Sequence, residues 1–151
     1  MSSLIYVQGH GARALGCRFI FVGEAPGKQE ELQGKPFVGR SGQYLREACS
    51  LFAINELNSY FTNVVKIRPK NNRSPTKEEL DSWIEPLVNE VSFIQEWYPK
   101  VKIVAVGKSA EYALQSAGFM FSSIIHPSYA LRFNKTKEFE DSIKEIINST
   151  E

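Results

Sequence analysis

The sequence predicts an α/β fold, a three-layer α/β/α arrangement around a central four-stranded parallel sheet, and three observations support this class. Two runs, Phe19–Val22 and Val101–Val106, are almost continuously apolar, which is typical of strands buried on both faces of a parallel sheet. Helical patterns separate the strand-like runs, as strand–helix–strand units require. The joins between them are short, so the helices are expected to pack back onto the sheet.

The chain of 151 residues is long enough to build one domain and too short for two. It contains no repeat, low-complexity segment or linker, so a single domain is expected over residues 1–151. Four strands are expected, in chain order, at Arg18–Val22, Phe61–Lys66, Val101–Val106 and Ser123–Ile125.

Helices are expected between and after these strands. The segment Ser41–Phe52 places Leu45, Ala48 and Cys49 at helical spacing. A longer helix begins after Thr76, where Glu79 three residues on completes a capping-box signature. Its apolar stripe contains Pro86, which should kink or split the helix. Further helices are expected at Ser109–Ser116 and Lys135–Ile147.

The overall composition is that of an ordinary globular protein, with a formal net charge of +1. The chain has no apolar stretch near the ~20 residues that a membrane span needs, and its first residues lack the pattern of a secretory signal, so a cytoplasmic location is expected. Positive charge is concentrated locally, in a segment without acidic residues. A basic loop of this kind can bind phosphates, and its cations are Lys66, Arg68, Lys70 and Arg73.

The two cysteines and two histidines give little support for a metal site. Cys17 and Cys49 form no Cys-x-x-Cys pair, and buried reduced thiols are the expected state. His10 and His126 are too few for a histidine-rich zinc site. We expect no bound metal and no cofactor.

Polar residues follow the first and last expected strands, where open α/β sheets build their sites. Gly23-Glu24-Ala25-Pro26-Gly27-Lys28 is not a phosphate-binding P-loop, because three residues rather than four separate its glycines and no Ser or Thr follows the lysine. It is either a tight turn with an exposed Glu24, or a place where Ala25 and the glycines let a ligand approach the backbone. His126-Pro127-Ser128 follows Ile124-Ile125, and the histidine can be structural or functional.

Two residues between these segments suggest a pocket for a flat, hydrogen-bonding ring such as a nucleobase. Phe37 lies in a glycine-rich loop and can be either a core residue or a stacking platform. Asn63 lies within a strand-like run, where its amide either bonds a neighbouring loop or reads the edge of a pyrimidine. Gly39 and Ser41, at the start of the next helix, suit a phosphate.

Five segments, in this order, resemble the successive motifs of the uracil-DNA glycosylase superfamily, and most closely those of its fourth family. The resemblance extends from about Arg18 to Arg132. The segments are Gly23-Glu24-Ala25-Pro26-Gly27, Gln33-Gly34-Lys35-Pro36-Phe37-Val38-Gly39-Arg40-Ser41-Gly42-Gln43, Thr62-Asn63-Val64-Val65-Lys66, Asn72-Arg73-Ser74-Pro75-Thr76 and His126-Pro127-Ser128-Tyr129-Ala130-Leu131-Arg132.

The resemblance implies a role for each residue around the base. Glu24 matches the acidic residue that positions or activates the attacking water, and Ala25 stands where some other families carry a catalytic Asp. Glu30 matches a further carboxylate near the base. Phe37 matches the ring that stacks on uracil. Gly27 stands where some relatives use a tyrosine to block a 5-methyl group.

It also implies roles at the pyrimidine edge and along the DNA. Asn63 matches the amide that pairs with uracil and rejects cytosine, and His126 matches the histidine that bonds the uracil O2 as negative charge develops. Leu131 and Arg132 match the wedge that fills the gap left by a flipped nucleotide. With the basic loop and the helix start, the expected DNA contacts are Gly39, Ser41, Lys66, Arg68, Lys70, Arg73, Ser128, Leu131 and Arg132.

The sequence departs from the family in two places. The fourth family carries an iron–sulfur cluster on four cysteines, and Ile67 and Trp83 stand where two of them are expected. We therefore expect this chain to lack the cluster. Only 18 residues separate Gly107 from His126, so a hairpin of the family is expected to be missing.

Two functions follow as alternatives. One is a monomeric, cofactor-free glycosylase that removes uracil from single- or double-stranded DNA. The other is a non-catalytic module of the same fold that binds DNA, uracil or a nucleotide.

Overall fold

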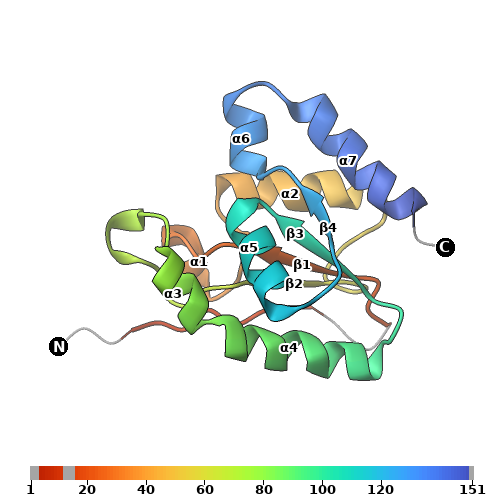
Figure 1. Cartoon of the computed structure of the whole chain (residues 1–151). Helices are drawn as coiled ribbons and strands as arrows, with labels where there is room; N and C mark the ends of the chain where they lie inside the picture. The colour runs from red at the N-terminus through yellow and green to blue at the C-terminus, as the bar shows by residue number, and fades with distance from the viewer. Residues whose placement is uncertain (1–3, 12–15, 150–151) are drawn as a thin grey trace.

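The computed structural model describes residues 4–11 and 16–149, and it has the predicted α/β architecture (Figure 1). The ends of the predicted domain, residues 1 and 151, lie outside the described residues. Four parallel strands form one sheet in the order β2-β1-β3-β4. The strands are β1 (Phe19–Gly23), β2 (Tyr60–Asn63), β3 (Lys102–Val106) and β4 (Ser122–Ile124).

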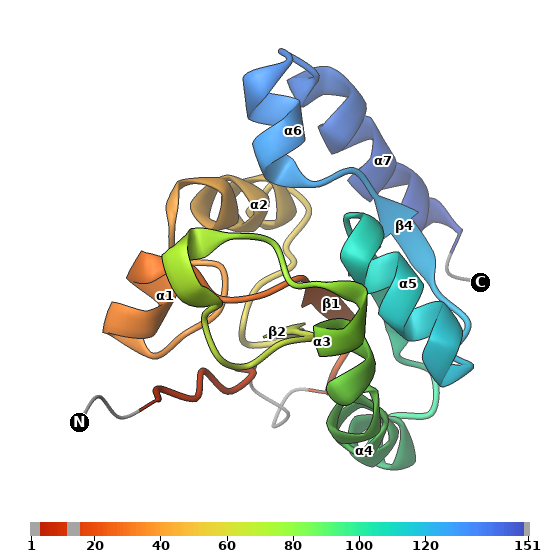
Figure 2. The same ribbon diagram turned by 60° about the vertical axis from the view of Figure 1, so that its left-hand side comes forward.

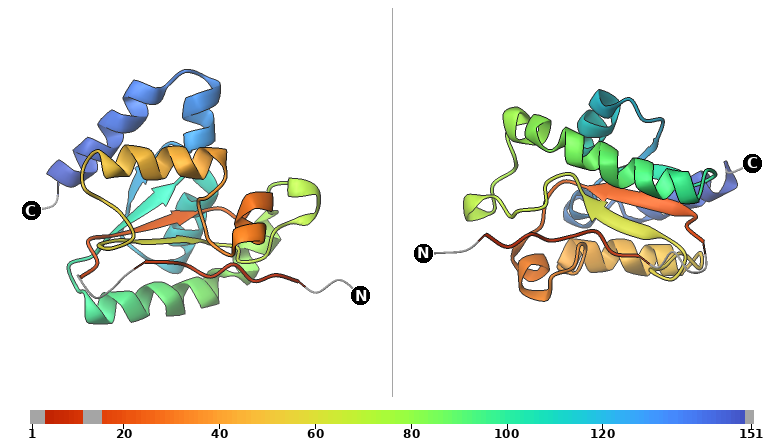
Figure 3. Two further views of the ribbon diagram at one scale, coloured as in Figure 1. Left: turned by 180° about the vertical axis from the view of Figure 1, so that it is seen from behind. Right: turned by 90° about the horizontal axis from the view of Figure 1, so that it is seen from below.

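Helices cover both faces of the sheet, as Figure 3 shows from behind and from below. One face carries α3 (Lys77–Ser82), α4 (Ile84–Trp97) and α5 (Lys108–Ala117). The other carries α2 (Arg40–Ser50), α6 (Pro127–Arg132) and α7 (Thr136–Asn148). The short helix α1 (Lys28–Gln33) follows β1, and a single 3₁₀ turn, η1 (Lys70–Asn72), lies in the basic loop.

Side-chain alternation along β1 divides the core into two layers. Ile20 and Val22 pack beneath α4 and α5, whereas Phe19 and Phe21 pack beneath α2 and α7. All five residues of β1 are buried, because the strand lies between β2 and β3 and is covered on both faces. This explains why the run is apolar throughout rather than alternating.

The segment before β1 covers the open edge of β2. Tyr6 pairs with Ile67 and His10 pairs with Phe61, both in the antiparallel sense. Backbone hydrogen bonds hold the segment in place. The N–H of Val7 donates to the carbonyl of Lys66 at 2.7 Å, and His10 and Phe61 exchange two bonds of 2.8 Å. A covered edge has no free row of backbone groups that could pair with another chain.

Two predicted boundaries were wrong, each for a local reason. The second strand ends at Asn63 rather than Lys66, at the point where β1 also ends, since Gly23 is the residue opposite Asn63. The long helix breaks at Trp83, where φ is −101° and ψ is 0°, rather than at Pro86. Pro86 lies in the first turn of α4, where a missing N–H costs nothing.

The carboxyl ends of all four strands meet α1, α6 and the basic loop on one side of the molecule. In Figures 1 and 2, α1 and the basic loop lie side by side there, and the ion pair between Arg68 and Glu31 joins them at 3.4 Å. Within the described residues, no helix is long and apolar enough to cross a membrane.

Candidate active site

The predicted site residues come together where the strands end. Gly23 at the end of β1 is in register with Asn63 at the end of β2. Glu24 follows Gly23, and His126 follows β4 by two residues. Parallel strands place their carboxyl ends at one edge, so four segments far apart in the sequence become neighbours there.

Gly23 lies between the Phe37 ring and the Asn63 amide. A Cβ atom on Gly23 would lie 2.5 Å from Oδ1 of Asn63 and 2.6 Å from Cζ of Phe37, so only glycine permits this approach. Phe37 and Asn63 are both buried, with 6% and 5% of their surfaces exposed. Phe37 also packs edge-on against Phe61, with 6.1 Å between ring centroids. It is therefore a core residue whose ring edge also borders the site.

Glu24 and His126 form the second half of the site. The hydroxyl of Ser109, in the first turn of α5, donates to Oε2 of Glu24 at 2.6 Å. The backbone of Gly107 lies against the imidazole, since a Cβ there would be 3.2 Å from Cδ2 of His126. The Gly107 φ of +92° further favours glycine at this turn.

The protonation state of His126 follows from its neighbours. The backbone N–H of Ser128 donates to Nδ1 of His126 at 3.1 Å, so in the neutral ring the proton lies on Nε2. Burial lowers the pKa of His126, and the nearby Glu24 carboxylate opposes that shift without cancelling it. A neutral imidazole with Nε2–H as its remaining donor is the resulting form.

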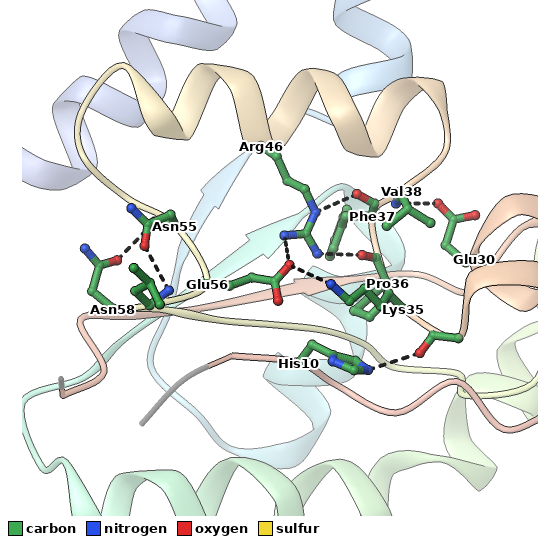
Figure 4. Close-up of polar contacts among 12 residues, drawn as sticks. His10, Glu30, Lys35, Pro36, Phe37, Val38, Arg46, Asn55, Glu56 and Asn58 are labelled. Carbon is green, nitrogen blue, oxygen red and sulfur yellow. Dashed lines mark hydrogen bonds and ion pairs between the residues drawn. The ribbon is translucent and has the colours of Figure 1, made fainter. Parts of the chain in front are cut away.

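Glu30, expected as a further carboxylate near the base, joins two loops of the site. Its carboxylate accepts three backbone N–H groups, from Gly27 at 3.0 Å, Val38 at 3.0 Å and Gly39 at 2.7 Å (Figure 4 shows Glu30 beside Val38). Glu30 thus ties the turn after β1 to the loop that carries Phe37. Ala25, in the same turn, is half-buried and packs against the core under α4 and α5.

A hollow of about 520 Å³ opens beside Glu30 and Ser128, and we call it the strand-end hollow. Its walls come from α1, the start of α2, and α6. They present three cations and the predicted wedge, and the lining residues are Lys28, Gln29, Glu30, Gly39, Arg40, Ser41, Ser128, Leu131 and Arg132. Cations around a hollow of this kind suit a phosphate backbone.

Two of the expected DNA contacts need correction. Lys66 is 2% exposed, and its ammonium pairs with Glu90 at 2.8 Å and donates to the carbonyl of Asn63, so it presents no charge to a phosphate. The N–H of Gly39 is already bonded to Glu30 and is not free for a ligand.

The other basic-loop residues lie at the surface. Lys70 and Arg73 are exposed, and Arg68 is half-buried. Arg73 makes two bonds to Glu79, at 2.6 and 2.9 Å, and this pairing lowers the pKa of the Glu79 carboxyl to about 2. The Arg73 charge is thus already paired within the chain.

The sequence interpretation missed Ser109, Lys28 and Arg40. Gly107-Lys108-Ser109 follows the third strand, so the rule that directed attention to the ends of the first and last strands would also have found Ser109. Lys28 and Arg40 each follow a glycine of the recognised motifs, but the sequence does not show that both face one hollow.

The residues present do not fit the iron–sulfur cluster that the resemblance implies. Ile67 and Trp83 both contact Tyr6. The backbone of Ile67 forms a β-bridge with that of Tyr6, and the Trp83 ring lies with its centroid 5.9 Å from that of the Tyr6 ring. Cys17 and Cys49, the only cysteines in the sequence, are buried on opposite faces of the sheet. In the part of the chain that the structure describes, no three residues of ligand type come together to hold a metal.

Comparison with known proteins agrees with the geometry. The model of the family described as "Uracil DNA glycosylase superfamily" matches residues 10–149. Proteins named Type-4 uracil-DNA glycosylase are similar to this chain. The one from Archaeoglobus fulgidus is 42% identical over 70% of this chain and 50% of its own length, and the one from Pyrobaculum aerophilum is 40% identical over 72% and 52%.

The Type-4 uracil-DNA glycosylase of Thermotoga maritima is 34% identical over 91% of this chain and 78% of its own length. The chain spans about half the length of the first two relatives. The family match and the positions of Glu24, Phe37, Asn63 and His126 lead to one conclusion: the chain belongs to the uracil-DNA glycosylase superfamily.

Proposed function

We propose that this chain removes uracil from single- or double-stranded DNA by hydrolysing the N-glycosidic bond, leaving an abasic site. The observation that carries the proposal is the convergence of four groups at the strand ends. They are the Phe37 ring, the Asn63 amide, the neutral His126 imidazole and the Glu24 carboxylate that is hydrogen-bonded to Ser109. All four come from one chain, so the proposed site needs no residue from a second copy, in keeping with a monomer. It needs no cofactor for this reaction.

Recognition depends on the Phe37 and Asn63 pair beside Gly23. The ring edge and the amide lie together against Gly23 at the strand ends, and these are the groups that would contact a flat pyrimidine. The amide offers an N–H donor to O4 of uracil and a carbonyl acceptor to N3–H. Cytosine presents the opposite pattern, and unpaired buried groups would then cost about 1–3 kcal/mol.

The chemistry requires charge stabilisation on both sides of the breaking bond. As the bond between C1′ and N1 breaks, its electron pair leaves with the base and negative charge develops on O2. The Nε2–H of His126 donates to that oxygen, a type of contact that contributes a factor of about 10²–10³ in rate. Glu24 faces the cationic sugar and orients the water, whose oxygen bonds C1′ while its proton neutralises the departing base.

DNA reaches the site from the strand-end hollow. The target nucleotide must leave the duplex, at a cost of a few kcal/mol, and Leu131 with Arg132 on α6 is placed to fill the gap. Arg40 and Lys28 contact phosphates beside the flipped nucleotide. Ser41, Ser128, Arg68 and Lys70 extend that contact surface.

The direct test is incubation of the protein with a labelled oligonucleotide that contains one uracil, followed by alkali treatment. Strand breaks at the uracil position, in single-stranded or duplex substrate, are expected, and oligonucleotides with cytosine in its place should remain intact. Thymine and 5-hydroxymethyluracil belong in the panel, because Gly27 has no side chain to exclude a 5-substituent.

Asn63→Ala and His126→Ala should each lower the rate by a factor on the order of 10², with circular dichroism unchanged. Intact strands at enzyme excess on both substrates would contradict the proposal. Binding of uracil-DNA in calorimetry without turnover would instead identify a non-catalytic module.

A further inference from the structure

The backbone of Phe37 has an unusual conformation. Its φ is +57°, in the left-handed region that side chains other than Gly, Asn and Asp rarely adopt. Such a conformation persists only where the surrounding structure enforces it, and it is concentrated at functional sites. Its surroundings therefore indicate what holds the Phe37 ring in place.

Arg46, on α2, holds the carbonyl side of this strained loop (Figure 4). Its Nε donates to the carbonyl of Phe37 and its Nη2 donates to the carbonyl of Pro36, both at 2.7 Å. Its Nη1 pairs with Glu56 at 2.7 Å, and the guanidinium lies 4.6 Å from the centroid of the Phe61 ring. One planar group thus bonds two successive carbonyls and stacks on the ring that supports Phe37.

Glu30 holds the other side of the loop. Its Oε2 accepts the N–H groups of Val38 and Gly39, the two residues that follow Phe37. Behind the loop, Gly42 of α2 lets the backbone approach closely, since a Cβ there would lie 2.3 Å from Cα of Phe37. Phe37 is therefore fixed from both sides and from behind.

We propose that Arg46, with Glu56 as its counter-ion, is a positioning residue that enforces the left-handed backbone of Phe37 and so sets the orientation of the ring beside the Asn63 amide. This inference rests on the proposed function, because it assigns the purpose of the clamp to base recognition. The role needs arginine, since lysine offers a single ammonium without the planar fork that bonds two carbonyls and stacks on a ring.

The test compares Arg46→Lys with Arg18→Lys. Arg18 provides a matched control because its guanidinium lies 5.4 Å from the centroid of Phe19, outside the site. Under single-turnover conditions, Arg46→Lys should release uracil about tenfold more slowly than the wild type. Its affinity for uracil-free duplex should be unchanged, and Arg18→Lys should release uracil at the wild-type rate.

A double-mutant cycle separates positioning from general loss of structure. If Arg46 acts through the ring, Arg46→Lys should slow a Phe37→Leu protein by less than about twofold, because the ring to be positioned is gone. An equal loss in both backgrounds, or a wild-type rate for Arg46→Lys, would overturn the inference. Should Arg46→Lys not fold, Glu56→Gln keeps the guanidinium and should slow release about threefold; a wild-type rate would then overturn the inference.

Hydrogen exchange distinguishes failure of this inference from failure of the proposed function. If the wild type releases no uracil, the proposed function fails, but the clamp can still be tested. The amides of Val38 and Gly39 should then exchange at least about tenfold faster in Arg46→Lys, and at the wild-type rate in Arg18→Lys. Unchanged exchange in Arg46→Lys would overturn the clamp itself.

Discussion

The imidazole of His126 shows how one residue can depend on its neighbour in a turn, since the backbone N–H and the hydroxyl of Ser128 lie 3.1 and 2.7 Å from Nδ1. The Ser128 N–H bonded to Nδ1 leaves Nε2–H as the donor, and burial keeps the ring neutral by lowering its pKa from 6.5. Protonation would place a second hydrogen on Nδ1, facing the Ser128 N–H. The protonated ring therefore gives up the bond from that N–H, and only the Ser128 hydroxyl oxygen, 2.7 Å from Nδ1, can accept the new proton.

This geometry predicts an acid limb in the rate of uracil release. Activity should be constant at neutral pH and fall on the acid side of pH 6.5, as pH passes the lowered pKa of His126. The free energy of unfolding should fall over the same range, because the unfolded chain binds the proton more readily than the native one.

The pH–rate profile of His126→Gln checks this prediction. Glutamine can donate a hydrogen bond but does not titrate, so the variant should be slower at neutral pH and lack the limb. A limb of unchanged position in His126→Gln would assign the titration to another group.

At the scale of elements, a buried ion pair joins the end of β2 to α4. The ammonium of Lys66 lies 2.8 Å from Oε1 of Glu90, and Oε2 of the same carboxylate accepts the hydroxyls of Tyr60 at 2.7 Å and Thr62 at 2.8 Å. Burial lowers the pKa of Lys66, and Glu90 opposes that shift. Because Lys66 also donates to the carbonyl of Asn63, this network holds the strand end that presents the amide.

Breaking this pair should be costly, and removing both partners should cost less than the sum of the two changes. Lys66→Met leaves the Glu90 carboxylate without its cation and should lower the free energy of unfolding by about 3 kcal/mol. In the Lys66→Met and Glu90→Gln double variant, much of that loss should be recovered. Urea titrations of the four proteins measure the coupling, and strictly additive losses would contradict it.

The elements that could be predicted are those with a strong pattern. The strand-like runs predicted the four strands to within a few residues, and the two almost continuously apolar runs became the two central strands, β1 and β3, because strands buried on both faces need continuous hydrophobicity. The helices α1 and α6 were missed because six residues are too few for a helical period. The start of α6 depends on a local feature instead, the His126 side chain capping the Ser128 N–H ahead of a favourable Pro127.

At the scale of the whole molecule, the site could be predicted only where its residues follow strand ends. Glu24 and His126 were found because parallel strands bring their carboxyl ends together, whereas Asn63 was singled out as a polar residue within a strand-like run and lies at the end of β2. Ser109 follows the third strand and could have been found by the same rule, but no local pattern indicates its bond to Glu24 across 85 positions of sequence. Lys66 was misassigned because a cation in a basic segment does not show which way its side chain points.

The charge distribution of the molecule leads to a last prediction. The net charge of +1 gives no general attraction for DNA, so binding should depend on the few cations at the strand-end hollow. Each phosphate contact contributes about 0.9 to the slope of log affinity against log salt concentration. Arg40→Gln should reduce the steepness of that slope for duplex DNA by about this amount.

Two variants serve as controls for this prediction. Lys102→Gln removes an exposed charge at the opposite end of β3 and should leave the slope unchanged. Arg73→Gln should change it less than Arg40→Gln, since Glu79 already pairs with that guanidinium. Fluorescence anisotropy at several salt concentrations measures all three. Equal changes in Arg40→Gln and Lys102→Gln would mean that DNA is attracted by the overall charge, and that the strand-end hollow is not where the phosphates bind.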